Sequence, residues 1–260
     1  MKATPLIRCE RHAHIATLTL NRPESLNALN AGMLASLNAQ LGELAQHDTP
    51  RALILTGEGK AFVAGGDIRA MQSMNPAEAK AFAEQGHAVL QMLTEAPYPV
   101  IAAINGFALG GGLELALACD MIIAAEEAKL GLPEVTLGVI PGFGGTFRLA
   151  QRVGLARARA LMLSAEVFDA QRAHQLGIID ELLPKDELMP RAQAIATGLS
   201  KHAPCALKQI KTLSISLSGT RTETRAAQEI DAFARCFATH DQREGMDAFL
   251  NKRPAQFKGH

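Results

Sequence analysis

The sequence predicts an α/β fold that turns mostly helical toward its C-terminus. Two short runs rich in strand-forming residues, 15–20 and 52–56, flank a segment of helical character, 30–46, and this is the rhythm of a βαβ unit. From residue 144 onward the pattern is mostly helical. The chain has 260 residues, which is enough to bury a sizeable core as one domain with an appended helical segment.

The other expected elements follow from the same patterns. In chain order they are a helix at 76–93, a buried strand at 100–104, a short helix at 111–119, a strand at 121–125, a short strand at 177–183, and helix after helix from 186 to 250. No internal repeat is visible in the sequence. We therefore divide the chain into a core, 1–200, that carries the functional site, and a C-terminal helical segment, 201–260.

Composition and charge exclude several classes of protein. Lys and Arg number 26, Asp and Glu also number 26, and a balanced chain of this kind gives no reason to expect binding to nucleic acid or to an anionic membrane. The cysteines are scattered without a CxxC pair, so we expect reduced thiols and no metal site. With no long apolar segment at the N-terminus or elsewhere, we expect a cytoplasmic protein.

The most informative stretch, 105–149, contains two glutamates in apolar and glycine-rich surroundings. Glu114 is the one polar residue in the run 113–119, whereas an amphipathic surface helix would carry a polar face. A carboxylate in a buried helix is paired, protonated or held for chemistry. Glu134 lies twenty positions later, and both carboxylates are candidates for catalysis.

The glycines before Glu114 supply a second argument. The N-terminus of a helix has backbone N–H groups without intrahelical partners, and Gly111 could offer such a donor to a substrate oxygen. Gly111 and Glu114 are three positions apart and share one helix face. A donor for a developing oxyanion beside a proton-moving carboxylate suits chemistry through an enolate. The alternative from these residues is a tight helix–strand junction, with Glu114 in a salt bridge.

Five motifs, which occur along the chain in the family's order, resemble those of the enoyl-CoA hydratase/isomerase (crotonase) family. They are Asn105-Gly-Phe-Ala-Leu-Gly-Gly-Gly-Leu-Glu-Leu115, the stretch from Leu132 through Glu134 to Thr146, Leu20-Asn-Arg-Pro-Glu-Ser-Leu-Asn-Ala-Leu29, Lys60-Ala-Phe-Val-Ala-Gly-Gly-Asp-Ile68, and Ala248-Phe-Leu-Asn-Lys-Arg253 with Phe257. The resemblance spans the whole chain. It implies a crotonase-like core of ββα units followed by a C-terminal helical segment.

The resemblance also implies an activity. In hydratases of this family two glutamates, here Glu114 and Glu134, handle a water molecule and the proton at C2 of a 2-trans-enoyl-CoA, giving a 3-hydroxyacyl-CoA. The backbone N–H groups of Gly66 and Gly111 would bind the thioester oxygen. No metal or redox cofactor is implied, since coenzyme A is part of the substrate. The step belongs to fatty-acid oxidation and to amino-acid and aromatic-acid degradation alike.

Further positions are carried over as substrate and coenzyme A contacts: Ser25, Leu26, Ala64, Gly65, Asp67, Ile68, Gly142, Phe249 and Lys252. Phe249 and Lys252 would act near the coenzyme A of a neighbouring subunit, in a homotrimer or a dimer of trimers. Two of these residues also have plainer interpretations. Asp67 follows the glycines as a helix cap would, and a lysine such as Lys252 is usually a solvated charge.

One departure from the family's pattern keeps other activities open. Many hydratases have alanine where this chain has Gly66, and a double glycine there is also similar to some hydrolases of the superfamily. The alternatives are an enoyl-CoA isomerase using Glu134 alone, an acyl-CoA thioester hydrolase, and a non-catalytic subunit that binds CoA thioesters. The presence of Glu114 favours the hydratase.

Overall fold

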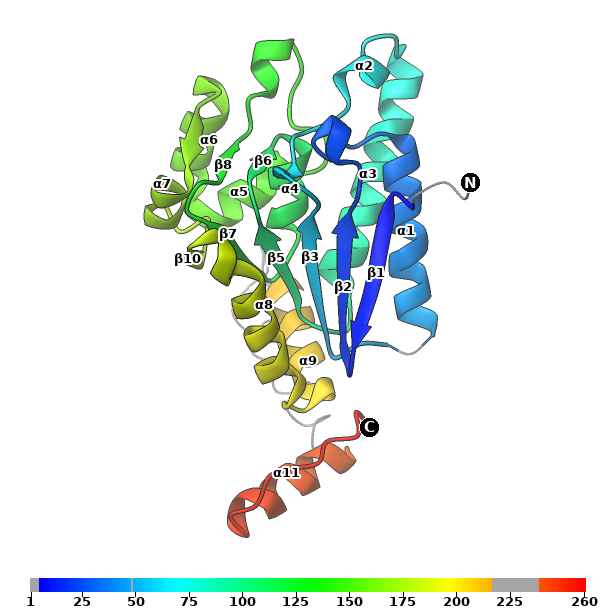
Figure 1. The fold of residues 1–260 in the computed structure, drawn as a ribbon, viewed down its shortest axis with the longest axis vertical. Coiled ribbons are helices and arrows are strands. Elements are labelled where there is room, and N and C mark those ends of the chain that lie inside the picture. Colours follow the sequence, from blue (N-terminus) through cyan, green and yellow to red (C-terminus); the bar gives the residue numbers. More distant parts are fainter. Residues whose placement is uncertain (1–4, 48, 217–238) are drawn as a thin grey trace.

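The computed structural model describes residues 5–47, 49–216 and 239–260, and its core is built on two β-sheets. The larger sheet has the strand order β1-β2-β3-β5-β7-β10 and the smaller the order β4-β6-β8-β9 (Figure 1). The strands of the larger sheet are β1 (Ile7–His12), β2 (Ile15–Leu20), β3 (Ala52–Gly57), β5 (Val100–Ile104), β7 (Met121–Ala125) and β10 (Glu181–Leu183). Those of the smaller sheet are β4 (Ala61–Val63), β6 (Phe107–Leu109), β8 (Lys129–Gly131) and β9 (Val167–Asp169).

Both sheets are parallel except at one edge strand each. In the larger sheet β1 is antiparallel to β2, and in the smaller sheet β9 is antiparallel to β8. The predicted βαβ unit is confirmed, because β2 pairs in parallel with β3 and a helix, α1 (Ala31–Gln46), connects them. Asn30 caps this helix by accepting the N–H of Met33 at 2.9 Å.

A repeating unit explains how the two sheets are connected. Strands β3, β5 and β7 of the larger sheet each continue into a strand of the smaller one, β4, β6 and β8, and a helix follows each pair. The predicted crotonase-like fold of ββα units is therefore confirmed. The repeat was invisible in the sequence because β4, β6 and β8 have only three residues each, too few for a two-residue period to be recognised.

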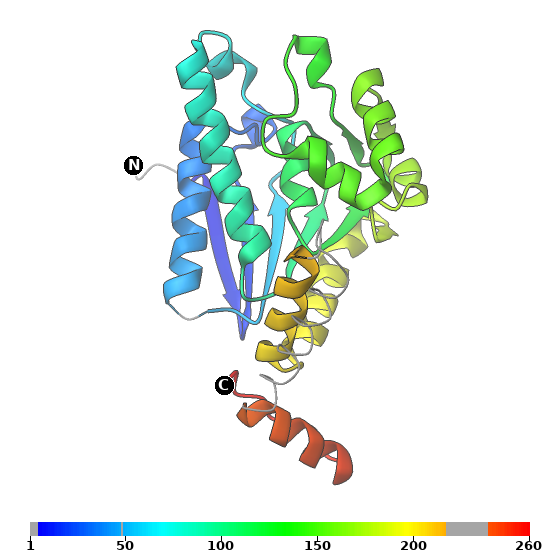
Figure 2. The same ribbon diagram turned by 180° about the vertical axis from the view of Figure 1, so that it is seen from behind.

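Helices cover both faces of the larger sheet. Figure 2 shows α1 and α3 (Pro76–Glu95) over one face, and Figure 1 shows α8 (Lys185–Ser200) over the other. Alternate residues of β3 belong to the two resulting cores, with Leu53 and Leu55 facing α1 and α3, and Ala52 and Ile54 facing α8. A sheet buried on both faces needs continuous apolar strands, and this accounts for the uninterrupted runs in the sequence.

The remaining helices lie around this core. They are α2 (Ile68–Met71), α4 (Gly111–Leu117), α5 (Gly145–Val153), α6 (Leu155–Ser164), α7 (Ala170–Gln175), α9 (Pro204–Ser216), α11 (His240–Leu250) and two 3-10 helices, η1 (Pro23–Ser25) and η2 (Glu134–Leu137). The strand predicted at 177–183 is wrong in its first half. Gly177, with φ +78°, donates its N–H to His174 O at 2.9 Å and closes a turn after α7, so that only Glu181–Leu183 forms a strand.

The described part of the C-terminal segment contains two helices, α9 and α11, and a non-helical end at 251–260. Part of the helical run predicted up to residue 250 lies outside the described residues, namely 217–238. Helix α9 packs on the core, and Lys211 Nζ donates to the carbonyl of Leu93 at 3.0 Å. Helix α11 lies at the end of the molecule opposite α2 (Figure 1). The division into 1–200 and 201–260 stays a prediction.

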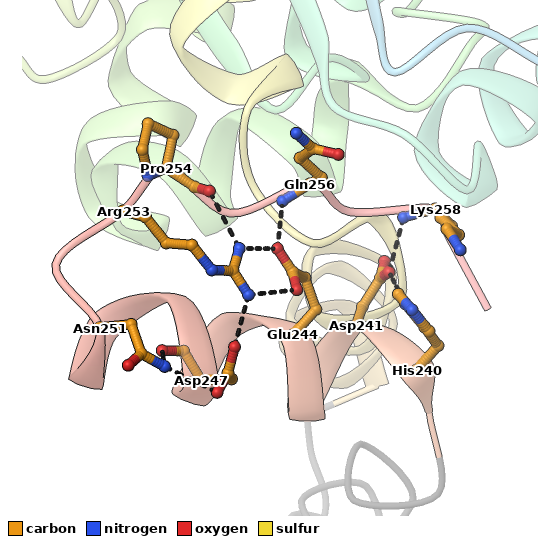
Figure 3. Close-up of polar contacts among 9 residues, drawn as sticks. All are labelled: His240, Asp241, Glu244, Asp247, Asn251, Arg253, Pro254, Gln256 and Lys258. Atoms are coloured by element: carbon orange, nitrogen blue, oxygen red, sulfur yellow. Dashed lines mark hydrogen bonds and ion pairs between the residues drawn. The ribbon is translucent and has the colours of Figure 1, made fainter.

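The chain after α11 folds back along that helix (Figure 3). The Asp241 carboxylate accepts the backbone N–H groups of Lys258 at 2.6 Å and Gly259 at 2.8 Å. The Arg253 guanidinium binds the Glu244 carboxylate through both terminal nitrogens, at 2.7 and 2.9 Å. These bonds attach the last residues of the chain to α11 and give the segment a defined shape.

Candidate active site

The site is built around the turn that leads into α4. Gly110 has φ +49°, a left-handed conformation that favours glycine, and its N–H donates to Gly131 O at 2.9 Å. A Cβ at Gly112 would collide with the carbonyl oxygen of Val63. Helix α4 therefore begins in direct backbone contact with strand β4, and only glycine permits so close an approach.

Glu114 lies inside the protein, as its apolar neighbours predicted. The residue is 1% exposed, and its Oε1 accepts two backbone N–H groups, from Phe143 at 2.8 Å and from Gly145 at 2.7 Å. Burial raises the pKa of Glu114 above its usual value, while the N–H groups of Gly145 and Phe143 and the charge of Arg148 act in the lowering direction. The alternative of a salt bridge at Glu114 is not observed among the described residues.

Glu134 lies close to the same turn. It is the first residue of η2, and its Oε1 lies 2.9 Å from the point where a Cβ on Gly110 would stand. Its Oε2 is buried and accepts no hydrogen bond in the described part of the chain. Burial raises the pKa of Glu134 to about 7, and the nearby Glu114 carboxylate adds to the rise. At neutral pH this carboxyl group is therefore present in both protonation states.

The loop that carries Gly66 is held against the segment after η1. Leu29 forms a parallel bridge with it, in which Leu29 N donates to Gly65 O and Asp67 N donates to Leu29 O, both at 2.8 Å. Ala64 N also donates to Leu26 O at 3.0 Å. These bonds bring the motif at 20–29 and the motif at 60–68 together, although they are separated along the chain.

The two glycine turns meet at the centre of the site. Gly65 Cα lies 3.7 Å from the Cβ position of Gly110, so the loop before α2 packs against the turn before α4. Within residues 5–47, 49–216 and 239–260, no hydrogen bond uses the backbone N–H of Gly66 or of Gly111. Two free donors thus lie on neighbouring turns, beside two carboxylates.

Asp67 has a structural role in this arrangement. Its Oδ1 accepts the N–H of Ala70 at 3.3 Å as the cap of α2, and its Oδ2 accepts Nη1 of Arg22 at 2.7 Å. The Arg22 hydrogen bond is the main cause of a pKa of Asp67 below the usual value. The helix-cap interpretation is confirmed, and Arg22 is a residue that the sequence did not single out.

The other predicted binding residues fall into two groups. Ser25, Leu26, Ala64, Gly65, Ile68 and Gly142 lie in the segments that surround the glycine turns, and the side chains of Leu26 and Ile68 are exposed. Phe249 lies in α11 and Lys252 two residues after its end, and this helix lies at the opposite end of the molecule from α2 (Figure 1). Within one chain the structure does not bring these two residues to the glutamates.

Further residues that the sequence did not single out support Glu114. Phe143 is buried, and its ring packs edge-to-face against Phe82 of α3, with the ring centroids 5.3 Å apart. Arg148 donates from Nη1 to Phe143 O at 2.8 Å. Asp120, the residue before β7, accepts Val100 N at 2.7 Å and pairs with Lys211 at 2.7 Å.

The described residues contain neither a membrane-spanning helix nor a metal-binding cluster. None of their helices is both long and apolar enough to cross a membrane. They also contain no group of three or more His, Cys, Asp or Glu side chains that could hold a metal ion.

A buried and a half-buried carboxylate beside two unused backbone donors, on an α/β fold of ββα units, are the arrangement of an acid–base enzyme. Comparison with known proteins agrees. The model of the enoyl-CoA hydratase/isomerase family matches residues 10–260. The chain belongs to this family.

Relatives and solved structures show how close the resemblance is. The chain is 42% identical over 249 residues to the crotonyl-CoA hydratase of Syntrophomonas wolfei, covering 95% of this chain and 96% of that protein. It is 39% identical to the 2,3-dehydroadipyl-CoA hydratase of Escherichia coli, covering 96% and 97%. The crystal structure of an enoyl-CoA hydratase from Bacillus anthracis superposes with a TM-score of 0.95 at 36% identity, covering 98% of this chain and 100% of that one.

Proposed function

We propose that this protein is an enoyl-CoA hydratase that adds water reversibly to a 2-trans-enoyl-CoA and gives a 3-hydroxyacyl-CoA. The observation that carries the proposal is the pair of carboxylates, Glu114 and Glu134, close to two glycine turns on which the N–H groups of Gly66 and Gly111 are unused among the described residues. An isomerase needs only one of these carboxylates, and a thioester hydrolase would have no proton to deliver at C2.

The proposed reaction uses each group in turn. Glu114 takes a proton from water while the water oxygen bonds to C3, and the C2–C3 π electrons move onto the thioester oxygen as an enolate. The N–H groups of Gly66 and Gly111 donate to that oxygen, and each such donor is worth about 3 kcal/mol in comparable oxyanion holes. Glu134 delivers its proton to C2 as the carbonyl re-forms. A net transfer of one proton from Glu114 to Glu134 restores the site.

The protonation states support this division of labour. A general acid must hold a proton at the working pH, and the pKa of about 7 for Glu134 provides one in a large share of molecules. Burial raises the pKa of Glu114 as well, and the two hydrogen bonds to its Oε1 oppose that rise by favouring the ionised form, in which it can act as a base. Addition of water to a conjugated thioester requires no redox step, so the proposal includes no metal or cofactor beyond the coenzyme A of the substrate.

The proposed binding surface for coenzyme A consists of the segments around Ser25, Leu26 and Ala64 to Ile68, with Gly142 facing the acyl group. Asp67 acts there through its contacts with Arg22 and Ala70, because both carboxylate oxygens are already engaged. Relatives named for different acyl groups, crotonyl and 2,3-dehydroadipyl, share the enoyl-CoA class. We therefore assign the class of substrate and leave the acyl group to measurement.

We also propose that the chain forms a homotrimer or a dimer of trimers, in which Phe249 and Lys252 reach the coenzyme A of a neighbouring subunit. Exposed apolar side chains around η2, α5 and α6 support burial by another copy, and they are Val135, Leu137, Val139, Ile140, Phe147, Leu155 and Leu163. Light scattering coupled to gel filtration measures the mass, and a monomer at micromolar concentration would contradict this part of the proposal. A cytoplasmic location stays a prediction.

The first test of function is direct. Crotonyl-CoA is mixed with the purified protein, and the absorbance of the conjugated enoyl thioester is followed beside a parallel assay for free thiol. Hydration predicts loss of the absorbance without release of coenzyme A. Thiol release would indicate a hydrolase, and turnover of a 3-enoyl-CoA without any hydration would indicate an isomerase.

A further inference from the structure

Arg148 is linked to Glu114 through the backbone of a single residue. Arg148 lies in the first turn of α5 and donates from Nη1 to the carbonyl of Phe143 at 2.8 Å. The N–H of the same Phe143 donates to Glu114 Oε1 at 2.8 Å. The second donor to that oxygen, Gly145 N at 2.7 Å, is two residues further on. The loop 143–145 therefore has Glu114 on one side and the guanidinium on the other.

The guanidinium is held in this position by its surroundings. Its Cζ lies 4.8 Å from the centroid of the Phe147 ring, a cation–π distance. A side chain at Gly144 would collide with Arg148 Nη1, so the glycine leaves the room that the guanidinium fills. Among the described residues Arg148 forms no salt bridge. A half-buried cation without a carboxylate in contact needs another source of stabilisation.

The Glu114 charge contributes to this stabilisation, together with the Phe143 carbonyl and the Phe147 ring, and the effect is mutual. Ionised Glu114 raises the pKa of Arg148 against the lowering effect of burial, and Arg148 lowers that of Glu114. Of the other titratable groups around Glu114, Glu134 reaches it from η2 and is negative when ionised. Cys119, two residues beyond the end of the helix that carries Glu114, stays neutral because burial raises the pKa of its thiol.

We propose that Arg148 is a positioning residue for hydration, which fixes the loop that binds Glu114 and supplies a positive charge that favours the ionised form of this carboxylate. The inference rests on the proposed function, because it assumes that Glu114 must be ionised to take a proton from water. Arg148 touches neither substrate nor reacting atoms in this scheme. It acts through Glu114 and through the loop 143–145.

Two substitutions separate the two parts of this role. Arg148→Gln removes the charge and keeps a side-chain donor for Phe143 O, whereas Arg148→Lys keeps the charge and loses the planar guanidinium. Without the charge the acidic limb of kcat/KM for crotonyl-CoA moves to higher pH, and a move of one unit lowers the rate on that limb about tenfold. With lysine the limb stays in place and kcat falls, because the loop is held less firmly.

Binding provides the readout that a general structural role would change. Butanoyl-CoA is a saturated thioester that cannot be hydrated. It should bind both variants with a Kd within about threefold of that of the parent, a difference in binding free energy of less than about 1.4 kcal/mol, which corresponds to tenfold. Arg152→Gln is the matched control. Arg152 lies one turn further along α5 and pairs with Asp180 at 2.5 Å, outside the loop 143–145. Its loss should leave the pH profile unchanged.

The outcomes are distinct. If the parent protein hydrates neither crotonyl-CoA nor longer enoyl thioesters, the proposed function fails whatever Arg148 does. If the parent is active and Arg148→Gln keeps the parental pH profile, or if Arg152→Gln shifts it equally, the role of Arg148 is refuted. Loss of folding or of butanoyl-CoA binding in Arg148→Gln, measured by circular dichroism and calorimetry, would make the residue merely structural and also refute it.

Discussion

Arg22 donates from Nη1 to Oδ2 of Asp67 at 2.7 Å, and this ion pair joins the segment before η1 to the loop that carries Gly66. Arg22 also donates to the carbonyl of Ala28 at 3.2 Å. The side chains are only 20% and 13% exposed, so the pair is shielded better than an ordinary surface pair. It holds in place a backbone N–H that the proposed reaction needs as an oxyanion donor.

Substitution of Asp67 by Asn should therefore affect both stability and activity. We expect a loss of about 1–2 kcal/mol in the free energy of unfolding at neutral pH, because a charge-assisted hydrogen bond is removed. We also expect a lower kcat, because the loop at Gly66 is positioned less well. Urea unfolding and the crotonyl-CoA assay measure the two effects. Removal of the exposed Arg172–Glu166 pair by Arg172→Met is the control and should change stability by less than about 0.5 kcal/mol.

The stabilisation by the Arg22–Asp67 pair should depend on pH. Arg22 holds the pKa of Asp67 below its usual value, so the stabilisation is present above that usual value and is lost as the pH falls through the lowered one. The difference between parent and Asp67→Asn should therefore be largest at neutral pH and shrink below about pH 4. A difference that is constant from pH 7 to pH 3 would contradict the role of the ionised pair.

Replacement of either proposed catalytic carboxylate by its amide should lower kcat and leave binding almost unchanged. Glu114→Gln keeps an acceptor for the N–H groups of Phe143 and Gly145 but cannot take a proton, and Glu134→Gln cannot deliver one. We expect a loss of about 10²–10⁴-fold in kcat for each, with Kd for butanoyl-CoA close to that of the parent. Glu84→Gln on the exposed surface of α3 is the control. Near-parental turnover by either variant would exclude the mechanism with two carboxylates.

Glu134 should also make the protein less stable at higher pH. Its folded pKa of about 7 lies above the usual value of 4.5, so its contribution to stability is complete below the usual value and is lost as the pH rises through the folded one. Glu134→Gln does not lose stability in this way. The melting temperature of the variant minus that of the parent should therefore be larger at pH 8 than at pH 4. Calorimetry at both values provides the test. An equal difference at both would mean that Glu134 is solvated like an ordinary surface glutamate.

The sequence predicted the parts of the site that depend on local geometry. Gly111 and Glu114 are three residues apart on one short helix, so their common face follows from helix periodicity alone. Strands such as Val100–Ile104 and Met121–Ala125 were predicted at the bounds observed, because strands buried on both faces form continuous apolar runs. The resemblance to a family added the order of the motifs and the ββα units.

The contacts that hold the site together could not be predicted in the same way. Arg22 and Asp67 are 45 residues apart, and Glu114 and Phe143 are 29 apart, so no local period relates them. Arg148 lies in an amphipathic turn, where an arginine is normally a solvated charge. Only the packing of α5 against α4 shows that its guanidinium faces the loop that binds Glu114. Contacts of this kind depend on long-range packing, which the periodic patterns of one sequence do not predict.

The last prediction concerns Gly86, which lies on α3 directly against the ring of Phe143. A Cβ at this position would stand well inside contact distance of three ring carbons, and the ring is enclosed by Phe82 on another side. Gly86→Ala must therefore displace Phe143. We expect a cost of about 1–3 kcal/mol in the free energy of unfolding, as for other overpacked cores.

The displacement should also reach the chemistry, because the N–H of Phe143 is one of the two donors to Glu114 Oε1. We therefore expect a lower kcat for crotonyl-CoA than in the parent, even at a temperature where the variant is fully folded. Gly42→Ala on α1 is the matched control: nothing lies within 4 Å of its Cβ position, and the better helix propensity of alanine should stabilise the protein by about 0.5–1 kcal/mol with no change in kcat. If Gly86→Ala behaves like Gly42→Ala, then α3 can move away from the ring, and the packing of Phe143 does not control the position of the Glu114 carboxylate.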